Sequence, residues 1–397
     1  MKMDTITIIG GGFAGVQAAR AARRSHPSAH VQLIDDSGEA TMIPSLPDLF
    51  SGRLNDEALS RPLGEVAGDE FTYVRGRVHE IDLDKRVVSG VKMQAGFEPV
   101  YDVLVIATGS VPSQRPAALR SAPAFTVHSL EAARALREEL AARLSTAEEL
   151  NVVIAGAGYT GIETAVAIRD GVPDRDRLKI TLVDAATDIL PMLSESERQR
   201  VHGYLRERSI DLKLSTLVDR ASSREVLLGD GTRFHNALLI WSAGMVGAAP
   251  RLSVEVEATR DGRIITNEYL QLPSHPEVFI GGDLAAIKKR DALTRRAVNI
   301  AHYSGRRAGQ NAARMLQGRR LRTFTPVDLG WVIPLGGTSS GKIFGVIRVR
   351  GNLGLRLHYI MCGFRHFGGG RASHFYKTAF RLSQSTQNLV PERKRSA

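Results

Sequence analysis

Two short glycine-rich segments carry the clearest chemical signal in this chain. The first is Gly10-Gly11-Gly12-Phe13-Ala14-Gly15 after the apolar run 6–9, and the second is Gly156-Ala157-Gly158-Tyr159-Thr160-Gly161 after the apolar run 152–155. In this pattern the first glycine allows a tight turn, the second lets a pyrophosphate approach the backbone, and the third packs a helix on a strand. The free N–H groups at the start of that helix bind the phosphates. Two copies therefore predict two dinucleotide sites.

An acidic residue follows each glycine segment at the spacing of a ribose-binding carboxylate. Asp35 lies 20 residues after Gly15, and Asp184 lies 23 residues after Gly161. A carboxylate at this position accepts hydrogen bonds from ribose hydroxyls and repels a 2′-phosphate. No arginine follows Asp184 closely, so the second site is predicted to take NADH in preference to NADPH. For Asp35 the alternative is an exposed turn aspartate.

Length and composition favour an α/β protein of two or three domains. The chain has 397 residues, is 43% hydrophobic and contains 38 glycines. Its one cysteine, Cys362, rules out an intrachain disulfide framework and a dithiol redox pair, and argues against thiolate-bound zinc or iron–sulfur. No metal site is predicted. We find no room for a signal peptide before the first strand and no apolar run of about 18 residues, so a cytoplasmic location is expected.

The elements that position the glycine segments repeat in the same order. Periodicity predicts a strand, a helix and a second strand in each half, and later a buried strand that ends in a glycine turn. Between the two halves, residues 36–70 look irregular, segments 71–75 and 86–91 suggest a small antiparallel sheet, and 129–144 is strongly helical. Gly229-Asp230-Gly231 predicts a hairpin turn. The predicted elements are strands 5–9, 31–34, 101–106, 151–155, 179–183, 210–214, 224–228, 232–235, 238–241 and 278–280, and helices 13–24, 160–169 and 194–208.

The chain resembles the two-dinucleotide-binding flavoproteins of the pyridine nucleotide-disulfide reductase superfamily, and within them the type II NADH:quinone dehydrogenases. The resemblance depends on the two glycine segments and on further motifs spread over the first 340 residues. These motifs are Ala107-Thr108-Gly109, Glu163, Trp241-Ser242-Ala243-Gly244, Asp261-Gly262-Arg263-Ile264, His275-Pro276-Glu277-Val278-Phe279-Ile280-Gly281-Gly282-Asp283, Gly305 in a helix running to Asn311, and Asp328-Leu329-Gly330.

The resemblance implies an α/β fold with two Rossmann-like domains. The FAD domain is discontinuous, 1–113 and 260–325, and is interrupted by an NAD(P)H domain, 114–259; a C-terminal amphipathic region, 326–397, follows. It also implies bound FAD and an NADH substrate. The residues expected to bind the cofactors are Gly10, Gly12, Phe13, Ala14, Gly15, Asp35, Pro44, Ala107, Thr108, Gly109, Gly156, Gly158, Tyr159, Thr160, Gly161, Asp184, Ala243, Gly244, Gly282, Asp283 and Ala301.

Two acidic residues are given specific roles by the resemblance. Glu163 is expected to reach toward the junction of nicotinamide and flavin as the catalytic residue; the alternative is a carboxylate that suits the helix dipole. Asp283 is expected at the ribityl or pyrophosphate part of FAD; the alternative is an N-cap for a helix at 284–288. His302 and Tyr303 are weaker candidates, where an electron acceptor could dock.

The C-terminal end of the chain holds most of the net charge. Residues 342–397 contain eleven Lys or Arg and one acid, against a formal charge of +11 for the whole chain. Apolar and aromatic side chains recur at helical spacing over 353–382, which is typical of amphipathic helices that lie on an anionic membrane. Packing on the body or on a second subunit, as in a homodimer, is the alternative. Residues 383–397 are expected to be disordered.

Three functions are compatible with these features. The first is oxidation of NADH and reduction of a quinone at the cytoplasmic face of the membrane. The second keeps the flavoenzyme but replaces the quinone by a ferredoxin-like carrier or a specialised small molecule, since Asn299–Gly305 departs from the glutamine-rich motif of the family. A non-enzymatic protein whose basic tail binds nucleic acid is ranked last.

Overall fold

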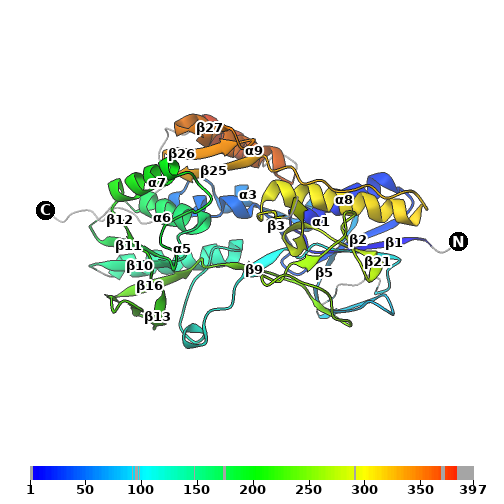
Figure 1. The fold of residues 1–397 in the computed structure, drawn as a ribbon, viewed down its shortest axis with the longest axis horizontal. Coiled ribbons are helices and arrows are strands. Elements are labelled where there is room, and N and C mark those ends of the chain that lie inside the picture. Colours follow the sequence, from blue (N-terminus) through cyan, green and yellow to red (C-terminus); the bar gives the residue numbers. More distant parts are fainter. Residues whose placement is uncertain are drawn as a thin grey trace. The chain divides into compact units, whose positions relative to one another are not determined.

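The chain divides into two compact units (Figure 1). A computed structural model describes residues 3–91, 93, 97, 99–146, 148–172, 176–289, 292–367 and 372–381. Unit 1 comprises 1–41, 61–111 and 245–329, and unit 2 comprises 42–60, 112–244 and 330–397. Each glycine segment falls in its own unit. The three-part division at residues 113, 259 and 325 stays a prediction, because residues 42–60 and 330–397 group here with the second glycine segment.

Unit 1 is built on a six-stranded sheet in the order β20-β21-β8-β1-β2-β5. Neighbouring strands run parallel except at the β20–β21 edge. The central strands are apolar and buried, as parallel strands covered on both faces must be. The bounds are β1 Thr5–Ile9, β2 His30–Asp35, β5 Thr72–Arg75, β8 Val103–Ile106, β20 Gln271–Leu272 and β21 His275–Ile280.

The last major strand of this sheet confirms that the first unit is discontinuous in sequence. Val278 of β21 pairs with Leu104 of β8, although 174 positions separate them. The predicted strand at 278–280 therefore does return the chain to the first sheet. Because β21 ends at Ile280, the turn Gly281–Asp283 emerges at the same edge of the sheet as the turn after β1.

Two helices of unit 1 lie against each other with backbone contact, α1 (Phe13–Ser25) and α8 (Val298–Leu316) (Figure 1). A Cβ atom on Gly305 would lie 2.1 Å from the Ala14 carbonyl oxygen, and one on Gly309 would lie 2.1 Å from the Ala18 oxygen. Only glycine allows this approach. The contact fixes the start of α1, where the first glycine segment leads into the helix.

Unit 2 contains a parallel four-stranded sheet in the order β12-β11-β10-β16. The hairpin predicted at Gly229–Gly231 is confirmed, since β14 and β15 pair antiparallel. The bounds are β10 Leu150–Ala155, β11 Leu178–Val183, β12 Ile210–Lys213, β13 Val218–Ala221, β14 Glu225–Leu228, β15 Arg233–His235 and β16 Ala237–Trp241, with α5 Leu130–Thr146, α6 Tyr159–Gly171 and α7 Glu195–Glu207.

The C-terminal part of unit 2 is a three-stranded antiparallel sheet with two helices. The strands are β25 (Gly330–Leu335), β26 (Thr338–Ile343) and β27 (Ile347–Arg350), and α9 (Gly351–Arg365) packs on them. Helix α10 (Ala372–Phe380) packs on α9. Two helices were predicted here and are found. The glycine break 368–370, Leu382 and the expected disorder of 383–397 lie outside the described residues.

One prediction of local structure is wrong, and one alternative is excluded. Segment 71–75 is not part of an antiparallel sheet: β5 extends the main parallel sheet, while β6 (Arg77–Asp82) pairs with β7 (Val87–Val91). As an edge strand, β5 has only one buried residue, Val74, and so lacks the continuous apolar run of the central parallel strands. The helix at 284–288, which the alternative role of Asp283 as an N-cap requires, is absent, since Ala285–Ala286 forms β22 against β19 (Ile264–Ile265).

The stretch 36–70 is ordered, contrary to its irregular sequence. Its helices have four or five residues each, too few for a periodic pattern. The elements of this stretch are β3 Glu39–Thr41, η1 Ile43–Ser45, α2 Asp48–Ser51, α3 Asp56–Leu59, β4 Ser60–Pro62 and α4 Leu63–Ala67.

The remaining short elements lie elsewhere in the chain. They are β9 Ser110–Pro112, η2 Ala117–Leu119, β17 Met245–Gly247, β18 Arg251–Leu252, η3 Gly282–Leu284, β23 Lys288–Lys289 and β24 Ala292–Leu293.

Candidate functional site

The first glycine turn joins β1 to α1 in unit 1. Gly10 has φ 104°, and a Cβ there would lie 2.5 Å from the Ala107 carbonyl oxygen. A Cβ on Gly15 would lie 1.7 Å from the Gly10 oxygen, so this glycine lets the helix pack on the turn. Gly12 is exposed, a Cβ there would meet no atom within 4 Å, and it precedes α1 without a side-chain cap. The turn therefore presents uncapped N–H groups to an anion.

Asp35 closes this turn from the end of β2. Its Oδ2 accepts a hydrogen bond of 2.7 Å from the Gly11 N–H, and its Oδ1 accepts one of 2.9 Å from the Ser37 N–H. The carboxylate is thus oriented by backbone donors, as expected of a ribose-binding aspartate rather than a free turn residue. Gly11 was not among the predicted residues; a side chain there would collide with Leu63.

Several other predicted residues lie beside this turn and form its rim. A Cβ on Gly282, which has φ 70°, would lie 2.8 Å from the Ala14 Cβ and 3.9 Å from the Ala301 Cβ. The Thr108 hydroxyl is buried and has no hydrogen-bond partner among the described residues. A buried hydroxyl without a partner next to an open glycine turn fits a bound dinucleotide, which would supply the missing acceptor or donor. The site of unit 1 is therefore compatible with FAD.

Asp283 lies on the same rim and is held by a hydroxyl. Burial raises the pKa of this carboxyl, although the hydrogen bond from Ser110 and the charges of Arg296 and Arg263 oppose that effect. The Ser110 Oγ donates to Asp283 Oδ2 over 3.2 Å. Gly109, with φ 71°, precedes Ser110 and accepts a hydrogen bond from the Ala248 N–H. Asp283 is not a helix N-cap, because no α-helix follows it.

The second glycine turn, in unit 2, repeats the geometry of the first. Gly156 has φ 111°, and its Cβ would lie 2.6 Å from the Ser242 oxygen; a Cβ on Gly161 would lie 1.9 Å from the Gly156 oxygen. Gly158 and Thr160 are exposed at the start of α6. Phe13, the counterpart of Tyr159 in the first turn, is buried. The two turns therefore have the same backbone geometry.

Asp184 holds the second turn as Asp35 holds the first. Its Oδ2 accepts from the Ala157 N–H over 2.8 Å, and its Oδ1 accepts from the Ala186 N–H over 2.9 Å. In the same unit, the Ser113 hydroxyl donates to the Ala243 carbonyl over 2.6 Å, and Gly244 has φ 82°. Tyr159 packs edge-on against Trp331, with 6.1 Å between ring centroids.

Glu163 faces a group of titratable side chains in unit 2. Burial raises the pKa of Glu163 to about 8, so its carboxyl is mostly protonated at neutral pH. It lines a cavity of about 20 Å³, room for roughly one water, together with Pro44, Asp48 and Arg53. No hydrogen bond of the Glu163 carboxyl is found among the described residues. Pro44 and Glu163 are thus brought together, as members of unit 2.

Sequence reasoning missed three residues that interact electrostatically with Glu163, namely Asp48, His358 and Cys362, and also Tyr359, the partner of Asp48. The Tyr359 hydroxyl donates to Asp48 Oδ1 over 2.6 Å, and the Cys362 thiol lies 3.7 Å from His358 Nε2. His358 and Cys362 stand four positions apart on α9, a spacing that could have been recognised on a predicted helix. Asp48 belongs to a helix of four residues, which is too short for a periodic signal. The charge of His358 lowers, and that of Asp48 raises, the pKa of Glu163.

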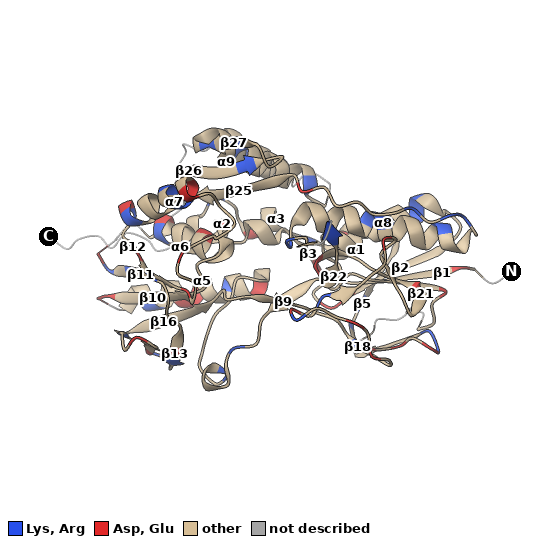
Figure 2. Cartoon of the chain, viewed as in Figure 1, with Lys and Arg blue, Asp and Glu red and all other residues tan. Residues whose placement is uncertain are grey.

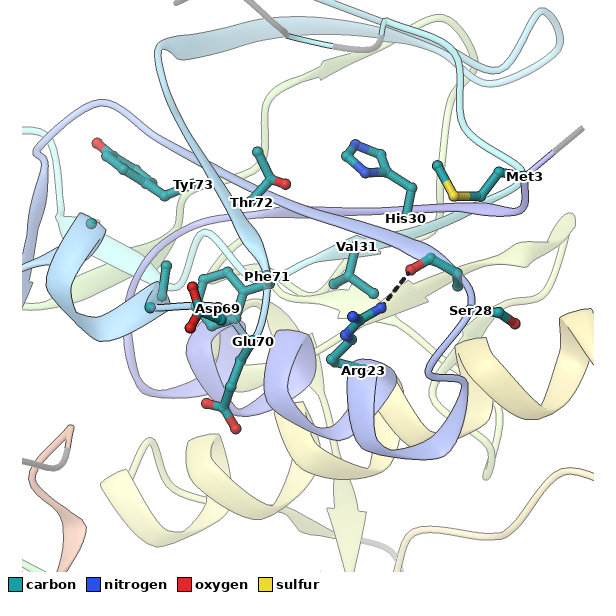
Figure 3. A pocket seen from close by; sticks show the side chains of 14 residues that line it. Met3, Arg23, Ser28, His30, Val31, Asp69, Glu70, Phe71, Thr72 and Tyr73 are labelled. Atoms are coloured by element: carbon teal, nitrogen blue, oxygen red, sulfur yellow. Dashed lines mark hydrogen bonds between the residues drawn. The ribbon is translucent and has the colours of Figure 1, made fainter.

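The remaining candidates and a second cavity lie elsewhere. His302 and Tyr303 belong to α8 of unit 1, with their rings 5.0 Å apart. A cavity of about 580 Å³ in the same unit is lined by Arg23, His30, Glu70 and Tyr73, among others, and by none of the predicted site residues (Figure 3). Among the described side chains, no group of three His, Cys, Asp or Glu residues could hold a metal ion.

Exposed apolar residues and basic residues occur together on the C-terminal elements of unit 2. We define the C-terminal surface by Phe344, Val346 and Leu353, which are 62%, 74% and 64% exposed, together with Phe364 and Phe380. Lys and Arg residues also occur on β27 and α9, which carry blue segments in Figure 2, and Lys377 lies on α10. Within the described ranges, no helix has the length and hydrophobicity needed to cross a bilayer.

Comparison with known proteins extends these observations. Residues 4–308 match the model of the family described as pyridine nucleotide-disulphide oxidoreductase. The type II NADH:quinone oxidoreductase of Staphylococcus aureus is 26% identical over 367 residues, which cover 86% of this chain and 90% of that protein. The predicted resemblance is confirmed at both levels.

Solved structures share the fold over nearly the whole chain. NDH2 from Plasmodium falciparum in complex with NADH has a TM-score of 0.82 at 13% identity and covers 98% of this chain and 100% of that one. The sulfide:quinone oxidoreductase from Aquifex aeolicus has a TM-score of 0.76 at 17% identity, covering 94% and 92%. These similarities confirm the predicted fold class.

Proposed function

Since the chain belongs to the pyridine nucleotide-disulphide oxidoreductase family, we propose that it is an FAD-dependent NADH dehydrogenase that reduces a quinone. The observation that carries the proposal is the pair of matched glycine turns, each closed by a carboxylate that accepts from the turn's own N–H. One turn in each unit provides for two dinucleotides. A quinone as the electron acceptor is supported by the relative named type II NADH:quinone oxidoreductase, whose alignment covers 86% of this chain.

In unit 1, different residues would bind different chemical groups of FAD. The glycine turn and the start of α1 offer N–H donors to the pyrophosphate, and Asp35 offers its carboxylate to the ribose. Thr108 and Asp283 supply polar groups on the rim. When bound, FAD supplies the two-electron chemistry that links hydride donation by NADH to reduction of the acceptor.

In unit 2, the second turn would bind the pyrophosphate of NADH, and Asp184 would select the free 2′-hydroxyl. A 2′-phosphate would place two negative charges against a carboxylate whose oxygens are already fixed by backbone donors. No arginine within the next residues, Ala185-Ala186-Thr187, offsets this repulsion. NADH is therefore the preferred reductant.

We assign Glu163 a role in proton delivery. Reduction of a quinone to a quinol takes up two protons, while NADH delivers a hydride, so a proton must come from the protein or solvent. A carboxyl whose pKa burial raises to about 8 holds such a proton at neutral pH. The small cavity beside Glu163 leaves room for a water that would pass the proton on.

We propose that the C-terminal surface binds the anionic leaflet of a membrane and that the enzyme acts at the cytoplasmic face. Basic side chains near anionic lipid contribute about 1 kcal/mol each. Two apolar residues of the C-terminal surface, Phe344 and Val346, lie in the turn between β26 and β27, which sequence reasoning did not single out. Helix α9 contributes both to the core of unit 2 and to the C-terminal surface: Leu355 and Tyr359 are fully buried, whereas Leu353 and Phe364 are exposed.

One assay tests the function directly. Purified protein should carry a flavin absorption spectrum and oxidise NADH with a water-soluble quinone analogue, and more slowly with oxygen, dyes or ferredoxin. Strong turnover with ferredoxin and none with any quinone would replace the quinone by a protein carrier. A colourless protein that takes up no flavin on reconstitution would overturn the proposal as a whole.

A further inference from the structure

Basic side chains share one face of the hairpin formed by β26 and β27 in unit 2. Lys342 lies opposite Arg348 in the register of the two strands, and Arg350 follows Arg348 by two positions. Residues two apart in a strand, and residues paired across two strands, lie on the same face of a sheet. Like charges directly opposite each other destabilise a hairpin. This face therefore favours an anion that would neutralise its charge.

Helix α9 covers the other face of the hairpin. A Cβ on Gly354 of α9 would lie 2.3 Å from the Ser339 Oγ. Val349, which lies between Arg348 and Arg350 in β27, is 6% exposed, whereas both arginines are exposed. Side chains alternate between the two faces along a strand. The basic side chains therefore point away from α9.

The face that carries these side chains is turned toward α6 and α7. Trp331 of β25 pairs with Lys342 and shares its face, and the Trp331 ring centroid lies 6.1 Å from that of Tyr159, at the start of α6. At the other end of β25, a Cβ on Gly336 would lie 2.6 Å from the Tyr204 hydroxyl of α7. Side chains of α7 are thus placed to meet the hairpin.

Arg200 of α7 adds a fourth cation to this face. Burial and the charges of Arg350 and Arg348 lower the pKa of Arg200. Glu197, on the same helix, interacts electrostatically with Arg348 and Lys342 and offsets part of the positive charge. Four cations and one carboxylate meet here, so positive charge is in excess.

Two side chains of this group have buried polar atoms without a partner. Ser340 lies opposite Arg350, on the face of the cations, and is 4% exposed. Its hydroxyl and the Nε and Nη2 atoms of Arg200 have no hydrogen-bond partner among the described residues. Buried donors are normally paired, so these atoms indicate a missing acceptor. We call the group the basic cluster: Arg200, Ser340, Lys342, Arg348 and Arg350.

We propose that the basic cluster binds the phosphate of an anionic lipid headgroup. Phosphate accepts several charged N–H donors at once, and arginine binds it through two parallel hydrogen bonds. A lipid is favoured over a soluble phosphate by the turn that joins the two strands, where Phe344 and Val346 are 62% and 74% exposed. An apolar turn can enter the acyl boundary while the neighbouring cations stay among the headgroups. The inference rests on the proposed membrane role of the C-terminal surface and adds a lipid class to it.

The test compares vesicles that carry equal negative charge on different groups. Phosphatidylcholine vesicles contain either phosphatidic acid, which offers a terminal phosphate, or oleate, which offers a carboxylate, in amounts that give the same zeta potential. Binding of the full-length, flavin-containing protein is measured by co-sedimentation. We expect the wild type to bind the phosphatidic acid vesicles at least about fivefold more tightly, roughly the effect of one basic side chain at an anionic surface. Equal binding to both would overturn the lipid class alone, whereas binding to neither would overturn the membrane role as well.

Variants on one helix separate a phosphate site from general attraction. Arg200→Gln should remove the preference for phosphatidic acid, because its guanidinium donors are lost. Arg206→Gln removes the same charge from an exposed position of α7 and should keep the preference. Melting temperature and flavin content verify the fold, and Arg348→Gln, at an exposed position, replaces Arg200→Gln if that variant does not fold. A preference that survives in the folded variant would contradict the proposal.

Two further measurements would reveal another occupant of the basic cluster. Inorganic phosphate that raises the melting temperature of the wild type but not of Arg200→Gln, without a preference between the vesicles, would assign the cluster to a soluble phosphate. A higher KM for NADH in Arg200→Gln, with the vesicle preference unchanged, would assign the cations to the nucleotide. Either result would overturn the headgroup proposal. NADH oxidation with a water-soluble quinone needs no membrane, so it tests the dehydrogenase separately.

Discussion

Glu163 was singled out from the sequence, and burial allows its carboxyl to hold a proton at neutral pH. If its carboxyl supplies a proton, kcat should fall as pH rises through about 8, where that proton is lost. Glu163→Gln should lower kcat at pH 7 by about 10²-fold or more, the usual contribution of a positioned acid, and remove the fall near pH 8. The measurement is steady-state NADH oxidation from pH 6 to 9.5 with a fixed quinone. A variant that retains both the rate and the pH profile would contradict the role.

The same pKa makes a separate prediction about stability. The unfolded chain releases the Glu163 proton near 4.5 and the folded chain near 8, so between these values the folded state holds more protons and its stability falls as pH rises. Glu163→Gln carries no such proton. Relative to the wild type, its melting temperature should therefore rise between pH 5 and 8 and level off above, as thermal unfolding across that range would show. A constant difference would indicate that the carboxyl is not buried as described.

Asp184 tests the cofactor preference. Asp184→Asn keeps an oxygen that can accept from the Ala157 N–H but removes the charge that repels a 2′-phosphate. The ratio of kcat/KM for NADH to that for NADPH should fall by about tenfold or more, equivalent to about 1.4 kcal/mol. Asp35→Asn is the matched control: the equivalent change in the first turn should weaken flavin retention and leave the nucleotide ratio unchanged.

Residues of the two turns could be predicted because their roles depend on local geometry. Glycines at fixed spacing and an aspartate at the next strand end determine the turn wherever the rest of the chain lies. Asp48 and its partner Tyr359 gave no comparable signal. They meet only through tertiary packing of a four-residue helix and a helix about 310 positions later, and no local pattern encodes that meeting.

At the scale of elements, the α1–α8 contact explains why two glycines of α8 cannot be exchanged. Gly305→Ala would place a methyl carbon 2.1 Å from the Ala14 oxygen, so the helices must separate. We expect a loss of about 1–3 kcal/mol in stability and weaker flavin binding, because Ala14 belongs to the first glycine turn. Gly203→Ala, in α7, is the control: it has open space and should be neutral or slightly stabilising. Chemical denaturation and flavin retention measure both effects, and equal behaviour of the two variants would refute the packing argument.

Long, buried elements could be predicted and short or edge elements could not. The parallel strands β1, β8, β10 and β16 are continuous apolar runs and were recognised as such. The strand β5 was assigned to the wrong sheet because its edge position leaves it one buried residue instead of a continuous apolar run. Ala285–Ala286 is helical by composition but extended in the structure, since pairing with Ile264–Ile265 outweighs local preference.

At the scale of the whole molecule, the C-terminal region is part of the folded body as well as a surface. Truncation after about residue 340 would remove half of β26 and all of α9, and with them the buried Tyr359 that binds Asp48. Loss of vesicle binding in such a truncation would therefore report unfolding as readily as loss of an anchor. Membrane binding has to be tested by substitutions on the exposed side chains alone.

Replacement of Phe344 and Val346 by serine provides that test. Full burial of one large apolar side chain contributes about 1.5–3 kcal/mol, so losing two that insert into the bilayer interface should weaken binding to anionic vesicles at least about tenfold. Leu217→Ser, which alters an equally exposed apolar residue outside the C-terminal surface, should bind as the wild type does. Co-sedimentation with vesicles of defined anionic lipid content measures both, at unchanged melting temperature and flavin content. Binding that survives the double substitution but vanishes in high salt would assign the attachment to the basic side chains, and binding insensitive to both changes would exclude this surface as the anchor.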